Sequence, residues 1–170
     1  TEALDPISGK LLWTASTGGM NASGLPQYGH GLVFVNNGMG SMSAISPDGK
    51  GSVEAVWSTR RNIPKKSSLI LHGTHLYMVA DTGVASCLDA KSGKSLWSER
   101  LDAGQFAASP ILSKGCLYFF SINGDVVVTA AEPKFKVLTR GRFDDGFMAS
   151  PAVTGNALIL RTKAAVYRVE

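Results

Sequence analysis

The sequence predicts an all-β protein, a β-propeller of four four-stranded antiparallel blades. Three observations predict it: a turn motif that recurs along the chain, a Trp that follows the motif at regular spacing, and short apolar runs separated by Gly, Asn and Asp. A unit of about 40–45 residues with four short strands has the size of a propeller blade. No segment of useful length shows the spacing of an amphipathic helix, which agrees with an all-β fold.

The turn motif occurs in two nearly identical copies. Asp5-Pro-Ile-Ser-Gly-Lys-Leu-Leu-Trp13 and Asp89-Ala-Lys-Ser-Gly-Lys-Ser-Leu-Trp97 agree in Asp, Ser, Gly, Lys, Leu and Trp at the same offsets. A decayed copy at 46–50 precedes Trp57, and a fourth copy at 131–134 precedes 137–138 and has lost its Trp. Asp and Ser can bond to nearby backbone N–H groups, and Gly accepts a positive φ, so the motif indicates a tight turn.

The Trp after each turn is expected on the outer strand of a blade. Its side chain is large and flat and has one N–H that needs a partner. We therefore expect it to pack one blade against the next, which is a structural role. The residues expected to dock blades in this way are Asp5, Gly9, Trp13, Trp57, Asp89, Gly93 and Trp97.

Apolar strand cores and turn residues place the blades at about 25–58, 68–102, 109–143 and 150–170. The third unit shows its strands best. An inner strand at 109–112 is followed by strands at 116–121, 125–130 and 135–143, with Asn-Gly as a hairpin signal before the third strand. The segment 1–17 contains an outer strand, which we expect to complete the blade at 150–170, since a closed propeller leaves no open sheet edge.

The repeated Asp-x-x-Ser-Gly-Lys-x-x-Trp resembles the repeat of pyrroloquinoline-quinone-like, or quinoprotein-like, propellers over essentially the whole chain. The resemblance implies that each Trp docks against the turn of the neighbouring blade. That family includes quinone-dependent alcohol and sugar dehydrogenases, and also non-enzymatic members such as a lipoprotein propeller that helps assemble bacterial outer-membrane proteins. The chain is similar to secreted bacterial members, which implies an extracytoplasmic location, periplasmic or secreted.

Rings of this family usually have seven or eight blades, so we expect the chain to be the C-terminal half of a longer protein. Two alternatives stay open. A homodimer could complete an eight-bladed ring about a two-fold axis, or a single chain could close as a four-bladed ring.

Residues for cofactor, metal or catalytic chemistry do not stand out, and we expect no cofactor and no enzyme activity. The resemblance implies that a quinone site needs adjacent cysteines, a stacking Trp and calcium ligands, but Cys87 and Cys116 are far apart in sequence. Without CxxC spacing they do not predict zinc, and we expect both to be free on strands. His30, His72 and His75 fall at turns, where exposure to solvent is expected.

The loops that connect one blade to the next carry the candidate interaction residues. These loops lie at 17–23, 59–67, 102–108 and 144–149, and functional residues of scaffolds tend to occupy such loops. The candidates are Arg60, Arg61, Lys65, Lys66, Phe106, Asp144, Asp145 and Phe147. Two structural alternatives stay open: the Phe residues could cap the core, and the charged residues could form solvated surface.

The function expected from these features is that of a non-catalytic binding or scaffold propeller whose loops contact a protein or peptide. The alternatives are part of a quinone-dependent dehydrogenase and a module that binds carbohydrate or cell-surface polymers. The net charge of +4 comes from scattered basic residues without interleaved aromatics, so no nucleic-acid partner is expected. Nor is membrane insertion expected, since no apolar stretch approaches about 20 residues.

Overall fold

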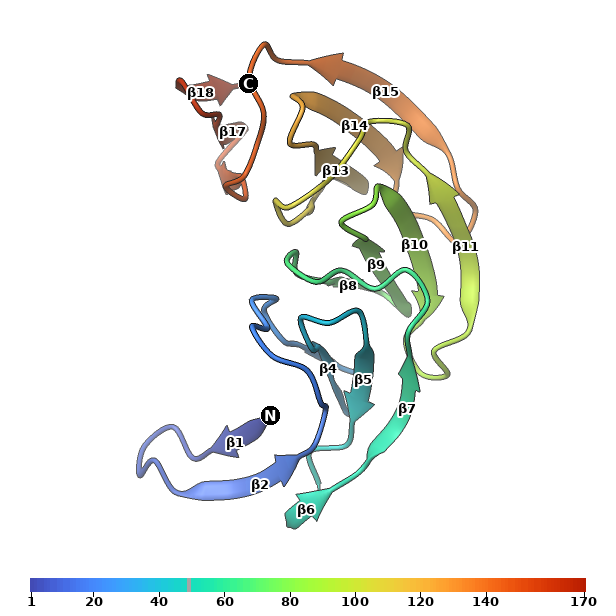
Figure 1. Cartoon of the computed structure of the whole chain (residues 1–170), viewed down its shortest axis with the longest axis vertical. Coiled ribbons are helices and arrows are strands. Elements are labelled where there is room, and N and C mark those ends of the chain that lie inside the picture. Colours follow the sequence, from blue (N-terminus) through green and yellow to red (C-terminus); the bar gives the residue numbers. More distant parts are fainter. Residues whose placement is uncertain (49) are drawn as a thin grey trace.

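The computed structural model in Figure 1 describes residues 1–48 and 50–170. Its strands form sheets that stand side by side in an open arc, with the two chain termini at the open side (Figure 1). Inner strands face the concave side of the arc, and β7, β11 and β15 follow its convex side. The described residues form no helix, so none could span a membrane. The predicted all-β propeller architecture is confirmed.

Three blades are four-stranded antiparallel sheets. The first blade consists of β3 (Gln27–Gly29), β4 (Leu32–Asn36), β5 (Met42–Ile45) and β7 (Ala55–Thr59). The second blade consists of β8 (Ile70–His72), β9 (His75–Val79), β10 (Val84–Asp89) and β11 (Ser95–Arg100). The third blade consists of β12 (Ile111–Ser113), β13 (Cys116–Phe120), β14 (Asp125–Ala130) and β15 (Val137–Arg142). In each blade the strands follow one another from the inner to the outer position, as the sequence predicts.

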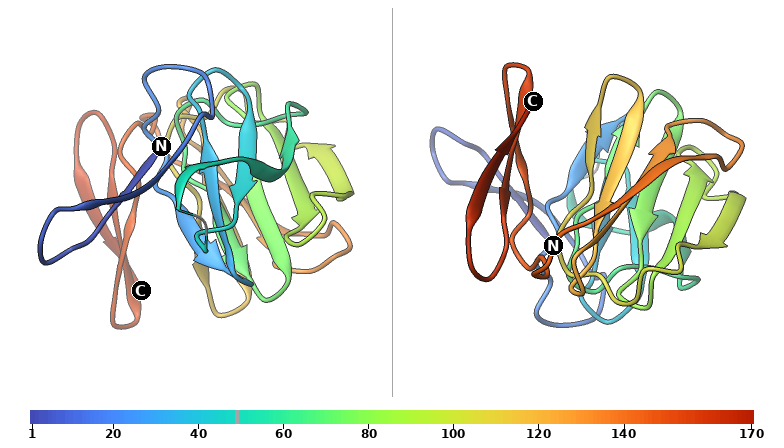
Figure 2. Two further views of the ribbon diagram at one scale, coloured as in Figure 1. Left: turned by 90° about the horizontal axis from the view of Figure 1, so that it is seen from below. Right: turned by 90° about the horizontal axis from the view of Figure 1, so that it is seen from above.

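Two smaller sheets lie at the ends of the arc. The fourth blade has three strands, β16 (Ala152–Thr154), β17 (Ala157–Arg161) and β18 (Val166–Val169). The N-terminal hairpin consists of β1 (Glu2–Leu4) and β2 (Leu11–Ala15), and β2 also pairs in parallel with β6 (Gly51–Val53). Figure 2 shows these two end sheets on the same side of the molecule, apart from the three complete blades.

The segment 1–17 does supply an outer strand, β2, but in this structure β2 pairs with β1 and β6. Its expected pairing with the blade at 150–170 is not made within the chain, and β18 pairs with β17 alone among the described strands. A short turn brings β2 back beside β1, whereas β2 and β18 lie at opposite ends of the open arc (Figure 1).

A β-bulge recurs at the same place beside every outer strand. The register pairs Ala3 with Trp13, Ala44 with Trp57 and Cys87 with Trp97, and in each case it shifts at the next residue of the inner neighbour. In the third blade the same shift follows the pair of Val128 and Thr139, so Thr139 holds the position that Trp holds elsewhere. The bulge turns each Trp toward the neighbouring blade, because an extra residue bends and twists the strand.

The hydrophobic core lies between blades. One cluster joins the first and second blades and contains Phe34, Met42 and Met78. A second cluster joins the second and third blades around Tyr77 and Trp97, and a third joins the third and fourth blades around Phe120. Since each cluster contains residues from adjacent sheets, each blade is stabilised mainly by the sheets that pack against it, as in other repeat proteins.

A chain of hydrogen bonds also connects successive blades near the start of each inner strand. The backbone N–H of Leu25 donates to Oγ of Ser68 at 2.9 Å, and Ser68 N–H donates to Oγ of Ser109 at the same distance. Ser109 N–H donates in turn to Oγ of Ser150, again at 2.9 Å. We call this series the serine ladder. It explains why Ser recurs in the sequence before the inner strands.

Candidate interaction face

One face of the arc gathers the loops that connect blades and the turns between second and third strands. The backbone N–H of Phe106 donates to the carbonyl of Asp81, and Phe147 N–H donates to the carbonyl of Ser121, at 3.1 and 3.0 Å. These bonds tie each connecting loop to a turn of the blade before it. We call this surface the linker face. It comprises the loops 17–23, 59–67, 102–108 and 144–149 and the turns 37–41, 80–83, 121–124 and 162–165.

The loop 59–67 is held firmly although it has no regular secondary structure. The amide of Asn36, which is 4% exposed, donates to the carbonyls of Pro64 and Ser67 at 3.0 and 3.1 Å. The side chain of Ile63 is buried, and Oγ of Ser67 donates to the carbonyl of Val79 at 3.1 Å. Because both its backbone and its apolar side chain are anchored, this loop fixes the backbone positions from which its exposed side chains project.

Four basic side chains project from this anchored loop into solvent. Arg60, Arg61, Lys65 and Lys66 are all exposed. Lys66 forms an ion pair with Asp81 at 3.7 Å, and the other three have no ion pair among the described residues. The carboxylate of Asp81 also accepts the backbone N–H of Lys65 at 2.9 Å, so part of its charge is used in holding the loop. The structure therefore exposes all four side chains, and their role as interaction residues stays a prediction.

Exposed methionines flank these cations and were not among the candidate residues predicted from the sequence. Met20 is 65% exposed and Met39 is 59% exposed. A methyl group placed on Gly38 would lie 2.4 Å from the carbonyl oxygen of Met20, and one placed on Gly40 would lie 3.9 Å from Cε of Lys65. The turn 37–41 therefore runs between the first connecting loop and the basic loop. Met in a Gly- and Asn-rich turn was the signal available in the sequence, since such turns are exposed.

A second exposed methionine site lies at the other end of the linker face. Met148 is 59% exposed, and it borders a hollow of about 270 Å³ that Arg161 and Lys163 also line. Both ends of the face thus combine cations with Met, a flexible and polarisable side chain that is common on adaptable binding surfaces.

Phe106 and Phe147 are not exposed on this face, with exposed fractions of 2% and 1%. Phe147 makes edge contacts with Phe120 and Phe143, with ring centroids 5.2 Å apart in both pairs. Each Phe forms an isolated bridge to the turn of a blade, and that pairing directs its ring between the sheets. Of the two alternatives, the structure supports capping of the core. The candidate role of these two rings as interaction residues is therefore corrected.

Asp144 is exposed and Asp145 is half-buried, in the last connecting loop. The structure brings them near the turn 121–124, since a methyl group on Gly124 would lie 2.9 Å from the carbonyl oxygen of Asp145. Within the described residues, no group of three or more His, Cys, Asp and Glu side chains could hold a metal ion.

The blade-docking residues lie at the opposite end of the blades, where the third and fourth strands meet. Nε1 of Trp57 donates to the carbonyl of Ala90 at 3.2 Å, and Nε1 of Trp97 donates to that of Glu132 at 3.1 Å. A methyl group on Gly93 would lie 2.6 Å from the ring of Trp57, so Gly allows the indole to pack on the turn. Gly49 of the decayed motif lies outside the described residues.

The turn at 5–10 has the same internal hydrogen bonds as the turn at 89–94. In both, the first residue's carboxylate accepts bonds from the backbone N–H and the hydroxyl of a Ser, Ser8 or Ser92. The backbone bond from Ser8 lowers the pKa of Asp5, and the hydroxyl of Ser92 lowers the pKa of Asp89. These bonds favour the ionised carboxylate, which accepts them better than the neutral acid does.

The two cysteines are free, as expected, but their surroundings differ. Cys87 is buried in β10, and burial raises its pKa to about 12. Cys116, in β13, is half-buried. Nε2 of His30 lies 2.7 Å from the carbonyl oxygen of Gly73 and so links a turn of the first blade to one of the second. His72 and His75 are paired across that second turn.

Comparison with known proteins gives a family and a fold. The sequence matches, over residues 2–170, the PQQ-like family described as outer membrane protein assembly factor BamB. No curated protein matches the sequence.

Among solved structures, BamB from Moraxella catarrhalis is similar with a TM-score of 0.74 and 16% identity, covering 95% of this chain and 48% of that one. The computationally designed Ika8 protein has a TM-score of 0.81 and 11% identity, covering 98% and 51%. The quinohemoprotein alcohol dehydrogenase of Comamonas testosteroni has a TM-score of 0.67 and 17% identity, covering 78% and 23%. The chain thus spans about half the length of the first two, and at these identities the likeness shows the fold alone.

Proposed function

Since the chain belongs to the PQQ-like family described as outer membrane protein assembly factor BamB, we propose that it is a non-catalytic propeller scaffold that binds a protein segment on its linker face. The family also supports the proposal that it works outside the cytoplasm, in the periplasm or at the outer membrane. Binding would depend on shape and charge, because a rigid array of blades presents the loops.

The observation that carries this proposal is the anchored basic loop. Arg60, Arg61, Lys65 and Lys66 are exposed on a backbone that Asn36 and its neighbours hold in place. A surface that is ordered before binding loses less conformational entropy when a partner arrives. A cluster of cations on an anchored backbone therefore favours a binding site over ordinary solvated surface.

The side chains around the loop indicate the chemistry of the partner. Cations next to exposed Met20 and Met39 suit a segment that carries both carboxylates and apolar side chains. The cations would attract the segment and orient it, and the methionines would bury its apolar groups. We therefore propose an acidic, partly apolar protein segment as the ligand.

A binding measurement with defined peptides tests this function. The probe is a fluorescent peptide that alternates Glu with Leu, and a Lys-Leu peptide is its charge-reversed counterpart. We expect the full chain to bind the acidic peptide only, with affinity that falls as salt rises. Changing the four basic residues to Glu should weaken binding about tenfold or more, because each exposed charge pair contributes about 0.2–1 kcal/mol.

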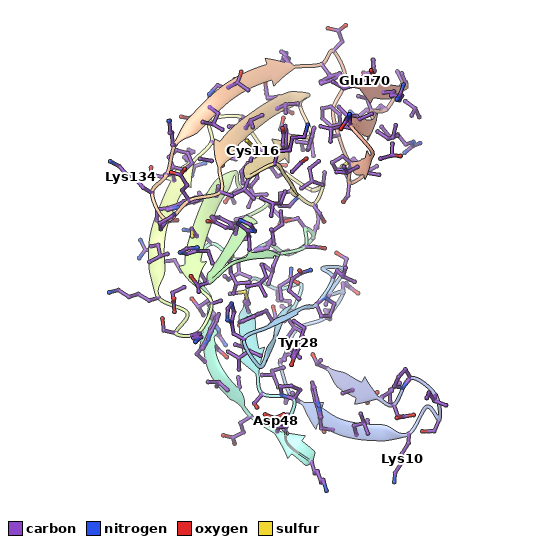
Figure 3. All side chains as sticks on the ribbon, turned by 180° about the vertical axis from the view of Figure 1, so that it is seen from behind. Lys10, Tyr28, Asp48, Cys116, Lys134 and Glu170 are labelled. Atoms are coloured by element: carbon purple, nitrogen blue, oxygen red, sulfur yellow. The ribbon has the colours of Figure 1, made fainter. Side chains whose placement is uncertain are left out.

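A matched control changes the same number of charges at the opposite end of the blades. It replaces four exposed lysines of the turns between third and fourth strands with Glu, namely Lys91, Lys94, Lys134 and Lys136. Figure 3 shows Lys134 on the convex side of the arc. Equal loss of binding in both variants would mean that net charge alone attracts the peptide. Full binding by the linker-face variant would reject the site.

The two alternative functions receive less support. The likeness to quinohemoprotein alcohol dehydrogenases concerns the fold, and it adds no argument for quinone chemistry in this chain. The carbohydrate alternative relied on Phe106 and Phe147 as exposed stacking rings, and both are buried.

A further inference from the structure

Each of the three complete blades presents a row of three paired side chains to the blade that follows it. The row runs from the second strand through the third strand to the outer strand, at the position of the bulge. In the first two blades it consists of an aromatic residue, a small residue and Trp, namely Phe34, Ala44 and Trp57, and then Tyr77, Cys87 and Trp97. In the third blade the same row consists of Tyr118, Val128 and Thr139.

The Trp of the first two rows lies against the aromatic residue of its own row. The ring centroids of Phe34 and Trp57 are 5.9 Å apart, and those of Tyr77 and Trp97 are 6.2 Å apart. Phe34 and Tyr77 are both fully buried. Tyr118 is only half-buried, and none of the ring contacts among the described residues includes it. The third row therefore leaves partly uncovered a ring that Trp covers in the other two blades.

The missing indole coincides with a hollow of about 280 Å³ between the third and fourth blades. Thr139 lines this hollow together with apolar side chains of both blades, which include Tyr118, Phe120, Val128, Phe143, Leu158 and Leu160. Gly141 also lines it, and a methyl group there would meet no atom within 4 Å in the part of the chain that the structure describes. The wall formed by β17 is of the kind that holds an indole elsewhere, because Leu158 has the position of Leu76, which packs in one cluster with Trp57.

The side chain that fills this space at the other junctions comes from the blade before the junction, as Trp57 and Trp97 do. On the far side of the first junction the turn contributes Gly93, which has no side chain to compete for the space. Thr139 lies inside a complete blade, and described sheets pack on both sides of that blade. The open space is therefore a property of Thr139 itself and requires no assumption about residues outside 1–170.

We propose that the junction of the third and fourth blades binds a small, flat aromatic molecule of about the size of an indole. Its ring lies in the position of the missing Trp, between Tyr118 of the third blade and Leu158 of the fourth. The two Trp-containing rows support an aromatic ligand, since walls of the same kind hold an indole at both. Apolar cavities stay free of water and bind small aromatic molecules, and contacts between rings contribute beyond the burial of apolar area.

Fluorine NMR of 5-fluoroindole with the full chain is the first test. The bound probe should show a broadened and shifted resonance that saturates with a Kd of about 0.1–1 mM, because a ligand with few atoms makes few contacts. Cyclohexanol is the non-aromatic comparison and should compete about tenfold more weakly, since it lacks the contacts between rings. Equal competition would overturn the aromatic class, and absence of saturable binding of 5-fluoroindole would overturn the site.

Thr139→Trp fills the hollow with the side chain that the other two rows contain. It should weaken the binding of 5-fluoroindole about tenfold or more, since the probe and the side chain would occupy the same space. The matched control, Leu138→Trp, adds the same indole one residue earlier on β15, where successive side chains point to opposite faces and Leu138 is already 45% exposed. The control should bind the probe as the wild type does. Unchanged binding by Thr139→Trp, or an equal loss in both variants, would reject the hollow as the site.

Intermolecular nuclear Overhauser effects locate the ligand in the wild type, so this test does not require that any variant folds. With unlabelled indole and a chain whose methyl groups carry carbon-13, contacts are expected with the methyl groups of Val128, Leu158 and Leu160, which line the hollow. Val56 and Leu96 are exposed apolar residues on the outer strands of the first two blades and serve as the comparison. Contacts confined to these two residues would place indole on the outer surface and overturn the proposal.

Discussion

The turns at 5–10 and 89–94 have the same motif and the same internal hydrogen bonds, yet they differ in what packs on them. Gly93 lies against the indole of Trp57, which donates to the carbonyl of Ala90. A methyl group on Gly9 would meet no atom within 4 Å in the part of the chain that the structure describes. The motif therefore determines the local turn, while a neighbouring blade determines whether the turn carries tertiary packing.

This difference separates two reasons for Gly in the motif, the backbone conformation of the turn and the packing between blades. Both glycines have positive φ, +67° at Gly9 and +70° at Gly93, so the backbone needs Gly at either turn. At Gly93 alone, a side chain would also collide with the indole of Trp57. Substitutions at the two turns can therefore separate backbone strain from packing between blades.

Removal of the indole should have the largest effect. Trp57→Ala should lower the free energy of unfolding by about 3 kcal/mol, because it deletes a large side chain packed between blades. Trp57→Phe retains an aromatic ring but loses the hydrogen bond to Ala90 and part of the packed surface, so it should cost less, about 1–2 kcal/mol. Urea unfolding followed by circular dichroism measures both. Equal costs for the two variants would mean that packing of the ring contributes little.

Gly93→Ala should have the next largest effect and lower the free energy of unfolding by about 2–3 kcal/mol. Its methyl group would lie 2.6 Å from the ring of Trp57 in addition to the strain of a positive φ. Gly9→Ala is the matched control and should cost about 1 kcal/mol, which is the strain alone.

The double variant Trp57→Ala with Gly93→Ala sharpens this comparison. With the indole absent, the Ala at position 93 should cost no more than Gly9→Ala does. The coupling energy should then be about 1–2 kcal/mol, and simple additivity of the two single effects would contradict the contact.

The smallest effect concerns the carboxylate that both turns contain. Bonds from Ser92, with His75 nearby, keep the pKa of Asp89 below its ordinary value. The stabilisation is therefore present above the ordinary pKa near 3.8 and is lost as pH falls through the lowered pKa. Asp89→Asn should be less stable than the wild type at pH 7 by at most about a few tenths of a kcal/mol, since the group is solvated. Thermal unfolding at pH 7 and at pH 2 measures the change.

Asp5→Asn provides the comparison, because the backbone bond from Ser8 lowers the pKa of Asp5 in the same direction. The difference in stability between the wild type and each Asn variant should become smaller at acidic pH, for Asp5→Asn as for Asp89→Asn. If this difference in stability increased as the pH fell, it would contradict the lowered pKa of both Asp5 and Asp89.

Much of the fold could be predicted from sequence because the repeat marks the four strands of each complete blade. The predicted strand at 125–130 is observed as β14, and the predicted strand at 116–121 differs from β13 by one residue. The lost Trp was harder to place. The sequence spacing pointed to 137–138, whereas the register gives Thr139, since the turn in the third blade has one more residue than that at 89–94.

The sequence pattern does not predict the parallel pairing of β2 with β6. β6 lies within a connection that is longer in the first blade than in the others, and nothing in its composition indicates a partner from another sheet. For the candidate site, exposure of the basic loop could be predicted from charge. The burial of Phe106 and Phe147 could not, because sequence does not show which way a loop directs its rings.

The serine ladder has a consequence for how such a chain can grow or shrink in evolution. Ser68 and Ser109 each offer a donor toward one neighbour and an acceptor toward the other. Duplication of one whole unit would recreate the same bond at both new junctions, and deletion of one would rejoin the remaining partners. Gene rearrangements in steps of whole blades keep this connection intact, and so the number of blades can change without loss of the bonds between them.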